Sequence, residues 1–163
     1  MTNIYALPDL EPRLIEHGEL KLIGIPCIGL DQMGAKFELA KRSLLDLHDH
    51  LTQIIHPRIH YGVWPQAAGQ ELPASHAYLL CVEVSTFDQV PEWFVRITLP
   101  PQHCVAAASM EGDFDAASRV IDAYLSEHGI RTEGQDRPYV ICERYRYDAE
   151  GFARYSLPLQ DSV

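Results

Sequence analysis

Hydrophobic residues recur along this chain with two spacings, one typical of helices and one typical of strands. Apolar residues three and four positions apart predict a helix over Ala35–Ile55, which must end before Pro57. The same spacing predicts a second helix over Phe114–His128, ended by Gly129. Apolar and β-branched runs bounded by turn residues predict strands over residues 13–28, 59–63, 76–85, 95–99, 102–110 and 139–147, and a final strand ending at 157–159.

The order of these elements repeats, which divides the chain into two halves of the same pattern. Residues 13–85 form a first β-α-β-β half, residues 86–100 a connector, and residues 101–160 a second half. We expect a single domain over 1–163, since this length is sufficient to bury one core. The two halves predict an α+β fold, with one antiparallel sheet, both helices on one face, and a ligand cleft on the other face.

The strand over 139–147 places one acidic residue among apolar ones. Because side chains alternate across a strand, one face should carry apolar or aromatic residues and a single carboxylate. The residues expected on that face are Tyr139, Ile141, Glu143, Tyr145 and Tyr147. Arg144 and Arg146 point to the other face and are not placed to pair with Glu143. A carboxylate on an aromatic face is unfavourable unless a partner neutralises it, so Glu143 is a candidate site residue.

The formal net charge of −10 bears on whether the protein binds nucleic acid or a cationic ligand. It argues against direct nucleic-acid binding, which needs clustered Lys and Arg, and it is compatible with a cationic ligand. The N-terminus lacks a basic region followed by an apolar run, and no apolar run has the length of a membrane span. We therefore expect a cytoplasmic protein without a membrane partner. Four widely spaced cysteines, expected to be reduced and buried, are Cys27, Cys81, Cys104 and Cys142.

Several segments, in their order and spacing, carry a resemblance to a known family. Tyr61-Gly62-Val63 ends a strand, and the strand Tyr78–Val84 leads into Phe87-Asp88-Gln89-Val90-Pro91. Glu143-Arg144-Tyr145 and Leu157-Pro158-Leu159 close the second half. Over about Leu14–Leu159 the chain resembles the GyrI-like small-molecule-binding domain, the effector-binding module of multidrug-sensing regulators of the AraC and MerR types. No helix-turn-helix or basic segment accompanies it, so we expect a stand-alone domain.

This resemblance implies a site. In the family, the glutamate of Glu-x-Tyr lies at the bottom of an aromatic pocket and pairs with cationic drugs, which implies that role for Glu143. Relatives often carry an acidic residue where this chain has Arg154, which implies a less acidic pocket. The aromatic candidates for the pocket wall are Tyr145, Trp93, Phe94, Trp64, Tyr61, Tyr78 and Tyr147. The alternatives are a structural Glu143 hydrogen-bonded to tyrosine hydroxyls, and core packing for each aromatic.

Histidines cluster in one region, but the cluster does not predict a metal site. His48 and His50 point apart on a helix, and His56 and His60 are separated by a proline. We expect no metal and no cofactor, since the chain also lacks a P-loop and a dinucleotide fingerprint.

Three functions fit these observations. The first is a binding protein that captures amphipathic cationic small molecules on Glu143. The second is an enzyme, because some relatives of the family hydrolyse reactive small molecules and Glu143 would suit acid–base chemistry. The third is protein inhibition, from which the family takes its name. We favour binding over catalysis; the natural ligand, any regulator partner and the oligomeric state stay open.

Overall fold

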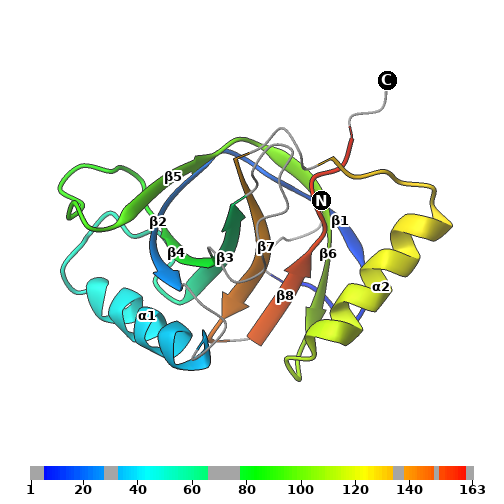
Figure 1. Cartoon of the computed structure of the whole chain (residues 1–163), viewed down its shortest axis with the longest axis horizontal. Helices are drawn as coiled ribbons and strands as arrows, with labels where there is room; N and C mark the ends of the chain where they lie inside the picture. Colours follow the sequence, from blue (N-terminus) through cyan, green and yellow to red (C-terminus); the bar gives the residue numbers. More distant parts are fainter. Residues whose placement is uncertain (1–5, 28–32, 66–77, 134–137, 149–150, 161–163) are drawn as a thin grey trace.

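The computed structural model describes residues 6–27, 33–65, 78–133, 138–148 and 151–160. Two helices and eight strands form an α+β fold with one antiparallel sheet, as the sequence predicts (Figure 1). The helices are α1 (Met33–Leu47) and α2 (Phe114–Glu127). The strands are β1 (Arg13–His17), β2 (Leu20–Cys27), β3 (Ile59–Pro65), β4 (Tyr78–Glu83), β5 (Val95–Leu99), β6 (Gln102–Ser109), β7 (Tyr139–Arg146) and β8 (Gly151–Tyr155).

The sheet order shows how the two halves join. Its strands follow one another as β1-β6-β8-β7-β3-β4-β2-β5. The β2-α1-β3-β4 and β6-α2-β7-β8 units therefore meet at their second strands, β3 and β7, in the centre of the sheet. Each half also contributes its leading strand to the other half, because β1 pairs with β6 and β5 pairs with β2. This exchange holds the two units in one continuous sheet.

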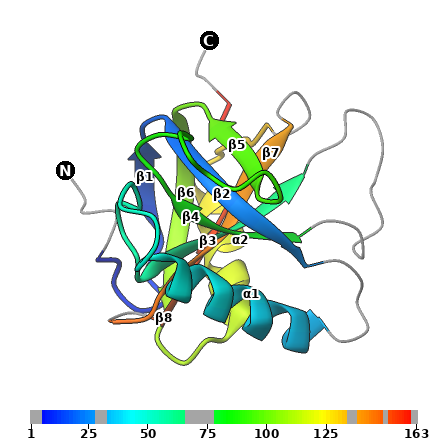
Figure 2. The same cartoon turned by 90° about the vertical axis from the view of Figure 1, so that its left-hand side faces the viewer.

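Both helices lie on the same face of the sheet. A row of directly opposed residues crosses five strands through Ala107, Arg154, Glu143, Gly62 and Leu80. Ala107 packs in the core cluster beneath α2, and Leu80 packs in the cluster beneath α1. The row therefore faces both helices, with Arg154 and Glu143 between them. Figure 2 shows α1 crossing in front of the strands.

The opposite face is filled by the largest core cluster. Alternate residues of the central strands, such as Tyr61 and Ile141, meet Ile15 from one edge strand and Leu99 from the other. Edge and centre can share a cluster only if the sheet curves around it. The sequence predicts a ligand cleft on this face; among the described residues apolar side chains fill it, and the cleft described below lies on the helix-bearing face.

Several element boundaries differ from the predicted ones for physical reasons. The predicted strand over 13–28 is two strands, because the segment before Gly18 pairs with β6 and the segment after it pairs with β4 and β5. The first helix ends at Leu47 instead of Ile55. Beyond it, the amide of Ile55 donates to the carbonyl of Glu83 in β4, so the backbone bonds to a strand instead of continuing the helix.

The second helix matches its prediction closely. It begins after Asp113, whose carboxylate accepts a hydrogen bond from the amide of Ala116 at 3.0 Å, and Gly129 follows it with a φ of +61°. The four cysteines are free thiols, as expected; three are buried and Cys142 is half-buried. The predicted loop over 65–75 lies almost wholly outside the described residues. Within those that are described, no helix has the length and apolar character to cross a bilayer.

Candidate functional site

Glu143 lies in the central strand β7 and is neutralised by an arginine from the next strand. Its side chain is only 9% exposed, and it lies directly opposite Arg154 of β8. The Arg154 Nη1 donates to Glu143 Oε1 at 2.8 Å. The resemblance implies a less acidic pocket with an arginine at this position; in the structure this arginine forms an ion pair with Glu143.

Two tyrosines bind the second oxygen of the same carboxylate. The Tyr78 hydroxyl donates to Glu143 Oε2 at 2.8 Å, and the Tyr145 hydroxyl also donates to that oxygen. The two hydroxyl oxygens are 3.0 Å apart. Burial, and after it neighbouring negative charges that include Glu143, raises the pKa of both tyrosines well above the ordinary value. Both hydroxyls therefore stay protonated at neutral pH and act as donors to the carboxylate.

A glycine makes this arrangement possible. Gly62 lies in β3, directly opposite Glu143, and a Cβ at this position would lie 2.0 Å from the Tyr78 hydroxyl oxygen. The Tyr78 ring starts from β4 and must cross β3 to reach Glu143 in β7. Only a residue without a side chain leaves room for that crossing.

A β-bulge in β7 changes the predicted faces of that strand. Gly62 pairs with Glu143 and Val63 with Ile141, so Cys142 is an extra residue opposite β3. Its thiol donates to the Gly62 carbonyl at 3.2 Å. As a result Ile141 packs in the core on the face away from the helices, whereas Glu143 faces them. The prediction that these two residues share a face is therefore wrong.

The rest of the predicted face divides at the same bulge. Tyr139 packs against the same core as Ile141, whereas Tyr145 packs in the cluster beneath α1. Arg144 lies on the face away from Glu143, as predicted; it is fully buried and its Nη1 donates to the Tyr155 hydroxyl at 3.2 Å.

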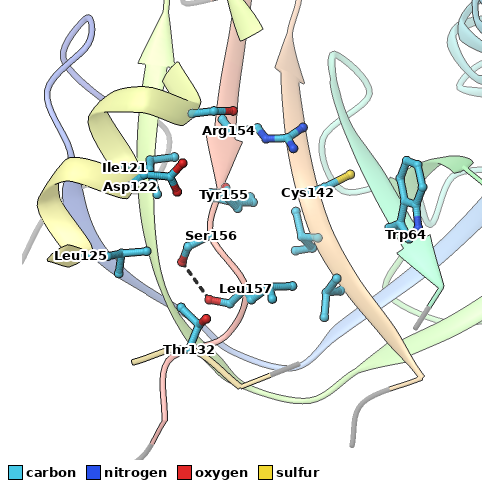
Figure 3. A pocket seen from close by; sticks show the side chains of 13 residues that line it. Trp64, Ile121, Asp122, Leu125, Thr132, Cys142, Arg154, Tyr155, Ser156 and Leu157 are labelled. Atoms are coloured by element: carbon cyan, nitrogen blue, oxygen red, sulfur yellow. Dashed lines mark hydrogen bonds between the residues drawn. The ribbon is translucent and has the colours of Figure 1, made fainter. Parts of the chain in front are cut away.

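A cleft of about 520 Å³ opens on the helix-bearing face between α2 and strands β7 and β8 (Figure 3). Apolar side chains from α2 form one wall, and Trp64 of β3 lies on the far side (Figure 3). Arg154 lines this cleft, whereas its ion-pair partner Glu143 does not. The residues that line the cleft are Trp64, Ser118, Ile121, Asp122, Leu125, Thr132, Val140, Ile141, Cys142, Arg154, Tyr155, Ser156 and Leu157.

The structure brings four of the predicted site residues together. Glu143, Tyr145 and Tyr78 form the hydrogen-bonded group described above. Trp64 contacts the Tyr78 ring edge-on, with 6.3 Å between ring centroids, and also lines the cleft. This cluster joins an apolar cleft to a buried carboxylate.

The other four predicted residues lie elsewhere. Tyr61 is buried in the core on the opposite face, and Phe94 is buried in the cluster beneath α1. Trp93 is 78% exposed on the turn before β5. Tyr147 lies outside the cleft, and its hydroxyl is 2.8 Å from Nδ1 of the fully buried His60.

Sequence reasoning missed the role of α2 and the requirement for Gly62. Ile121 and Leu125 belong to the apolar stripe predicted for this helix, but a stripe alone does not tell whether its residues pack in a core or line a cleft. Asp122 carries no sequence signal that separates it from other exposed acidic residues. Within the described ranges, no three His, Cys, Asp or Glu side chains form a group suited to a metal ion.

Comparisons with known proteins give matches in structure alone. No protein-family model matches the sequence, and no curated protein matches it. The C-terminal domain of EcmrR aligns over 93% of this chain and 98% of that domain, with a TM-score of 0.62 and 10% identity. The EcmrR–DNA complex aligns with the same TM-score and 12% identity over 93% of this chain but 58% of the EcmrR chain. This chain thus spans little more than half of that protein.

Two further solved structures have the same architecture. SAV2435, in a structure bound to tetraphenylphosphonium, aligns over 93% of this chain and 94% of its own, with a TM-score of 0.57 and 14% identity. A hydrolase from Listeria innocua aligns over 96% and 95%, with a TM-score of 0.57 and 13% identity. The chain has a GyrI-like fold. The resemblance noted in the sequence is therefore confirmed at the level of the fold.

Proposed function

We propose that this chain is a ligand-binding domain that captures amphipathic cationic small molecules in the cleft between α2 and strands β7 and β8. Glu143 would supply the countercharge. The observation that carries this proposal is a single buried carboxylate, adjoining an apolar cleft and held by two protonated tyrosine hydroxyls. Both tyrosine hydroxyls donate to Glu143 and leave its charge to be balanced by a cation, a place that the Arg154 guanidinium takes in this structure.

The energetics favour a lipophilic cation over a hydrated one. A cation about 4 Å from Glu143 gains roughly 4 kcal/mol at an effective dielectric near 20, before desolvation is subtracted. An aromatic ring that faces the cation adds about 0.5–2 kcal/mol, and Trp64 lines the cleft. Ile121 and Leu125 offer apolar surface to the body of such a ligand. The net charge of −10 attracts cations from solution.

The structural neighbours support the choice of ligand class. The structure of SAV2435 is bound to tetraphenylphosphonium, a lipophilic cation, and EcmrR has been solved in a complex with DNA. By analogy, this domain would sense a cationic ligand for a regulator or sequester the ligand itself. Because this analogy rests on the fold alone, the proposal has to be tested on the residues of this chain, Glu143 first.

Replacement of Glu143 tests the proposal directly. We expect Glu143→Gln to fold and to bind tetraphenylphosphonium at least about tenfold more weakly than the wild type, because the amide keeps the shape and loses the charge. Thermal shift followed by calorimetry measures this, with uncharged triphenylphosphine oxide as the matched ligand. Glu127→Gln, on the exposed end of α2, removes one acid that does not line the cleft and should bind as the wild type does. Equal affinity in wild type and Glu143→Gln would remove Glu143 from the site.

Hydrolysis of a reactive small molecule is a second candidate function. It is favoured by the pairing of a carboxylate with two protonated hydroxyls, an arrangement suited to general acid–base catalysis. A structural neighbour is described as a hydrolase, which supports the same hypothesis. Product formation from epoxide and activated-ester probes, abolished in Glu143→Gln, would favour catalysis. Saturable binding without product would favour the binding role.

A further inference from the structure

Arg154 occupies the position that the proposed cation would take. Its guanidinium donates to Glu143 Oε1 at 2.8 Å, while the two tyrosines bind Oε2. The arginine comes from the neighbouring strand at the directly opposed position, so its backbone holds it within reach of the carboxylate. In the described structure, therefore, both carboxylate oxygens are already hydrogen-bonded.

The exposure of the two partners shows which one a ligand meets first. The Arg154 side chain is 35% exposed and lines the cleft, whereas the Glu143 side chain is 9% exposed and does not line it. Figure 3 shows Arg154 at one end of the cleft, between α2 and β7. A ligand in this cleft can therefore take the place of Arg154 on Glu143 Oε1 only if the Arg154 side chain moves.

A displaced Arg154 would find a second acidic partner in the same cleft. Asp122 lines the cleft from α2 and is exposed. A long, flexible arginine side chain can exchange one carboxylate for another, and an exposed ion pair compensates part of the lost interaction. After this exchange Arg154 pairs with Asp122 and Glu143 pairs with the ligand, so neither Arg154 nor Glu143 is left without an opposite charge.

We infer that Arg154 is an internal competitor, which holds the Glu143 carboxylate until a cationic ligand displaces it. This inference rests on the proposed binding function and adds its regulation. Arg154 thereby sets the affinity that a cation needs in order to bind. A cation that binds Glu143 no better than the Arg154 guanidinium does not displace it, whereas a lipophilic cation that also fills the cleft does. Small hydrated cations gain nothing from the apolar walls and fail to displace it.

Removal of the competitor should strengthen cation binding. We expect Arg154→Gln to bind tetraphenylphosphonium at least about tenfold more tightly than the wild type, measured by calorimetry. Arg154→Lys keeps a positive charge and should stay close to the wild type. Arg119→Gln, on an exposed position of α2, makes the same change in net charge and should bind as the wild type does. In the Glu143→Gln background, Arg154→Gln should no longer increase affinity.

A second measurement uses the wild-type protein and does not depend on folding of the variants. Phenylglyoxal modifies exposed arginines, and mass spectrometry assigns the rate to each residue. Saturating tetraphenylphosphonium should accelerate modification of Arg154 and leave the rate at Arg119 unchanged.

The outcomes separate this inference from the proposed function. If the wild type binds the cation through Glu143 but Arg154→Gln binds it equally or more weakly, Arg154 is no competitor and the binding function stands. If the cation leaves the modification rate of Arg154 unchanged or lowers it, the inference is likewise wrong. If neither the wild type nor Arg154→Gln binds any cation, the proposed function itself fails.

Discussion

Gly62→Ala is the sharpest test of how the site is assembled. A Cβ at Gly62 would lie 2.0 Å from the Tyr78 hydroxyl oxygen, 2.6 Å from Cζ and 3.0 Å from Cε2. Tyr78 is 8% exposed and packs against Trp64, so its ring has little space to retreat. The new methyl group would therefore displace the hydroxyl from Glu143.

The expected cost follows from three contributions. Forcing a methyl group into a packed site costs about 1–3 kcal/mol. Loss of the 2.8 Å hydrogen bond from Tyr78 to the charged Glu143 costs about 1.5–3 kcal/mol. Alanine in a strand interior recovers about 0.5–1 kcal/mol relative to glycine. We expect Gly62→Ala to lower the free energy of unfolding by roughly 3 kcal/mol, which corresponds to about 6–12 °C in Tm for a domain of this size.

A double-mutant cycle shows whether Tyr78 is the cause. Tyr78→Leu lacks every atom of the clash, so in that background Gly62→Ala should be neutral or stabilising by up to about 1 kcal/mol. Gly34→Ala, in the first turn of α1, is the control, because a Cβ there has no neighbour within 4 Å. Urea and thermal unfolding measure all variants. Equal destabilisation by Gly62→Ala in both backgrounds would refute the crossing of Tyr78 over Gly62.

Two further predictions concern stability away from the cleft. Burial, and after it the nearby Lys41 charge, lowers the pKa of His60 to about 3 in the folded state, against 6.5 for the ordinary side chain. The contribution of neutral His60 to the free energy of unfolding is therefore complete above pH 6.5 and is lost as the pH falls toward 3. Between pH 6.5 and 5 the loss is roughly 2 kcal/mol, and His60→Gln should unfold in urea with a correspondingly weaker pH dependence; identical slopes would contradict the assignment. Asp113→Ala should lower the free energy of unfolding by about 1 kcal/mol, because it removes the cap on the Ala116 amide, and an unchanged urea midpoint would show that this cap contributes nothing.

Local sequence patterns predicted the ends of an element best where residues close in the sequence determine those ends. The second helix begins after Asp113 and ends before Gly129, and both of these signals lie next to the helix in the sequence. The first helix was predicted too long, because Leu51 and Ile54 keep helical spacing while a nonlocal partner, β4, takes the backbone of Ile55. The spacing of apolar residues indicates which residues are buried, but buried residues at helical spacing do not have to lie in a helix.

The sequence pointed to the acid of the candidate site and to three aromatic residues that gather around it, but not to the ion pair or the bulge. Glu143 stands out from the sequence because a carboxylate interrupts an apolar strand. Its partner Arg154 is 11 residues away in the chain, and only the pairing of β7 with β8 brings the two side chains together. The bulge at Cys142 is invisible to an alternation rule, which assumes that each residue of a strand has a counterpart.

The position of the site follows from the way the two halves meet. Glu143 and Gly62 face each other across the β3–β7 pair, where the first half joins the second. Tyr78 reaches the carboxylate from the strand beyond β3, and Arg154 reaches it from the strand beyond β7. The second half holds the carboxylate, its donor Tyr145 and its partner Arg154, whereas the second donor, Tyr78, comes from the first half. Tyr78 therefore reaches Glu143 only when the central β3–β7 pair forms, and a ligand that replaces Arg154 binds a carboxylate at the junction of the two halves.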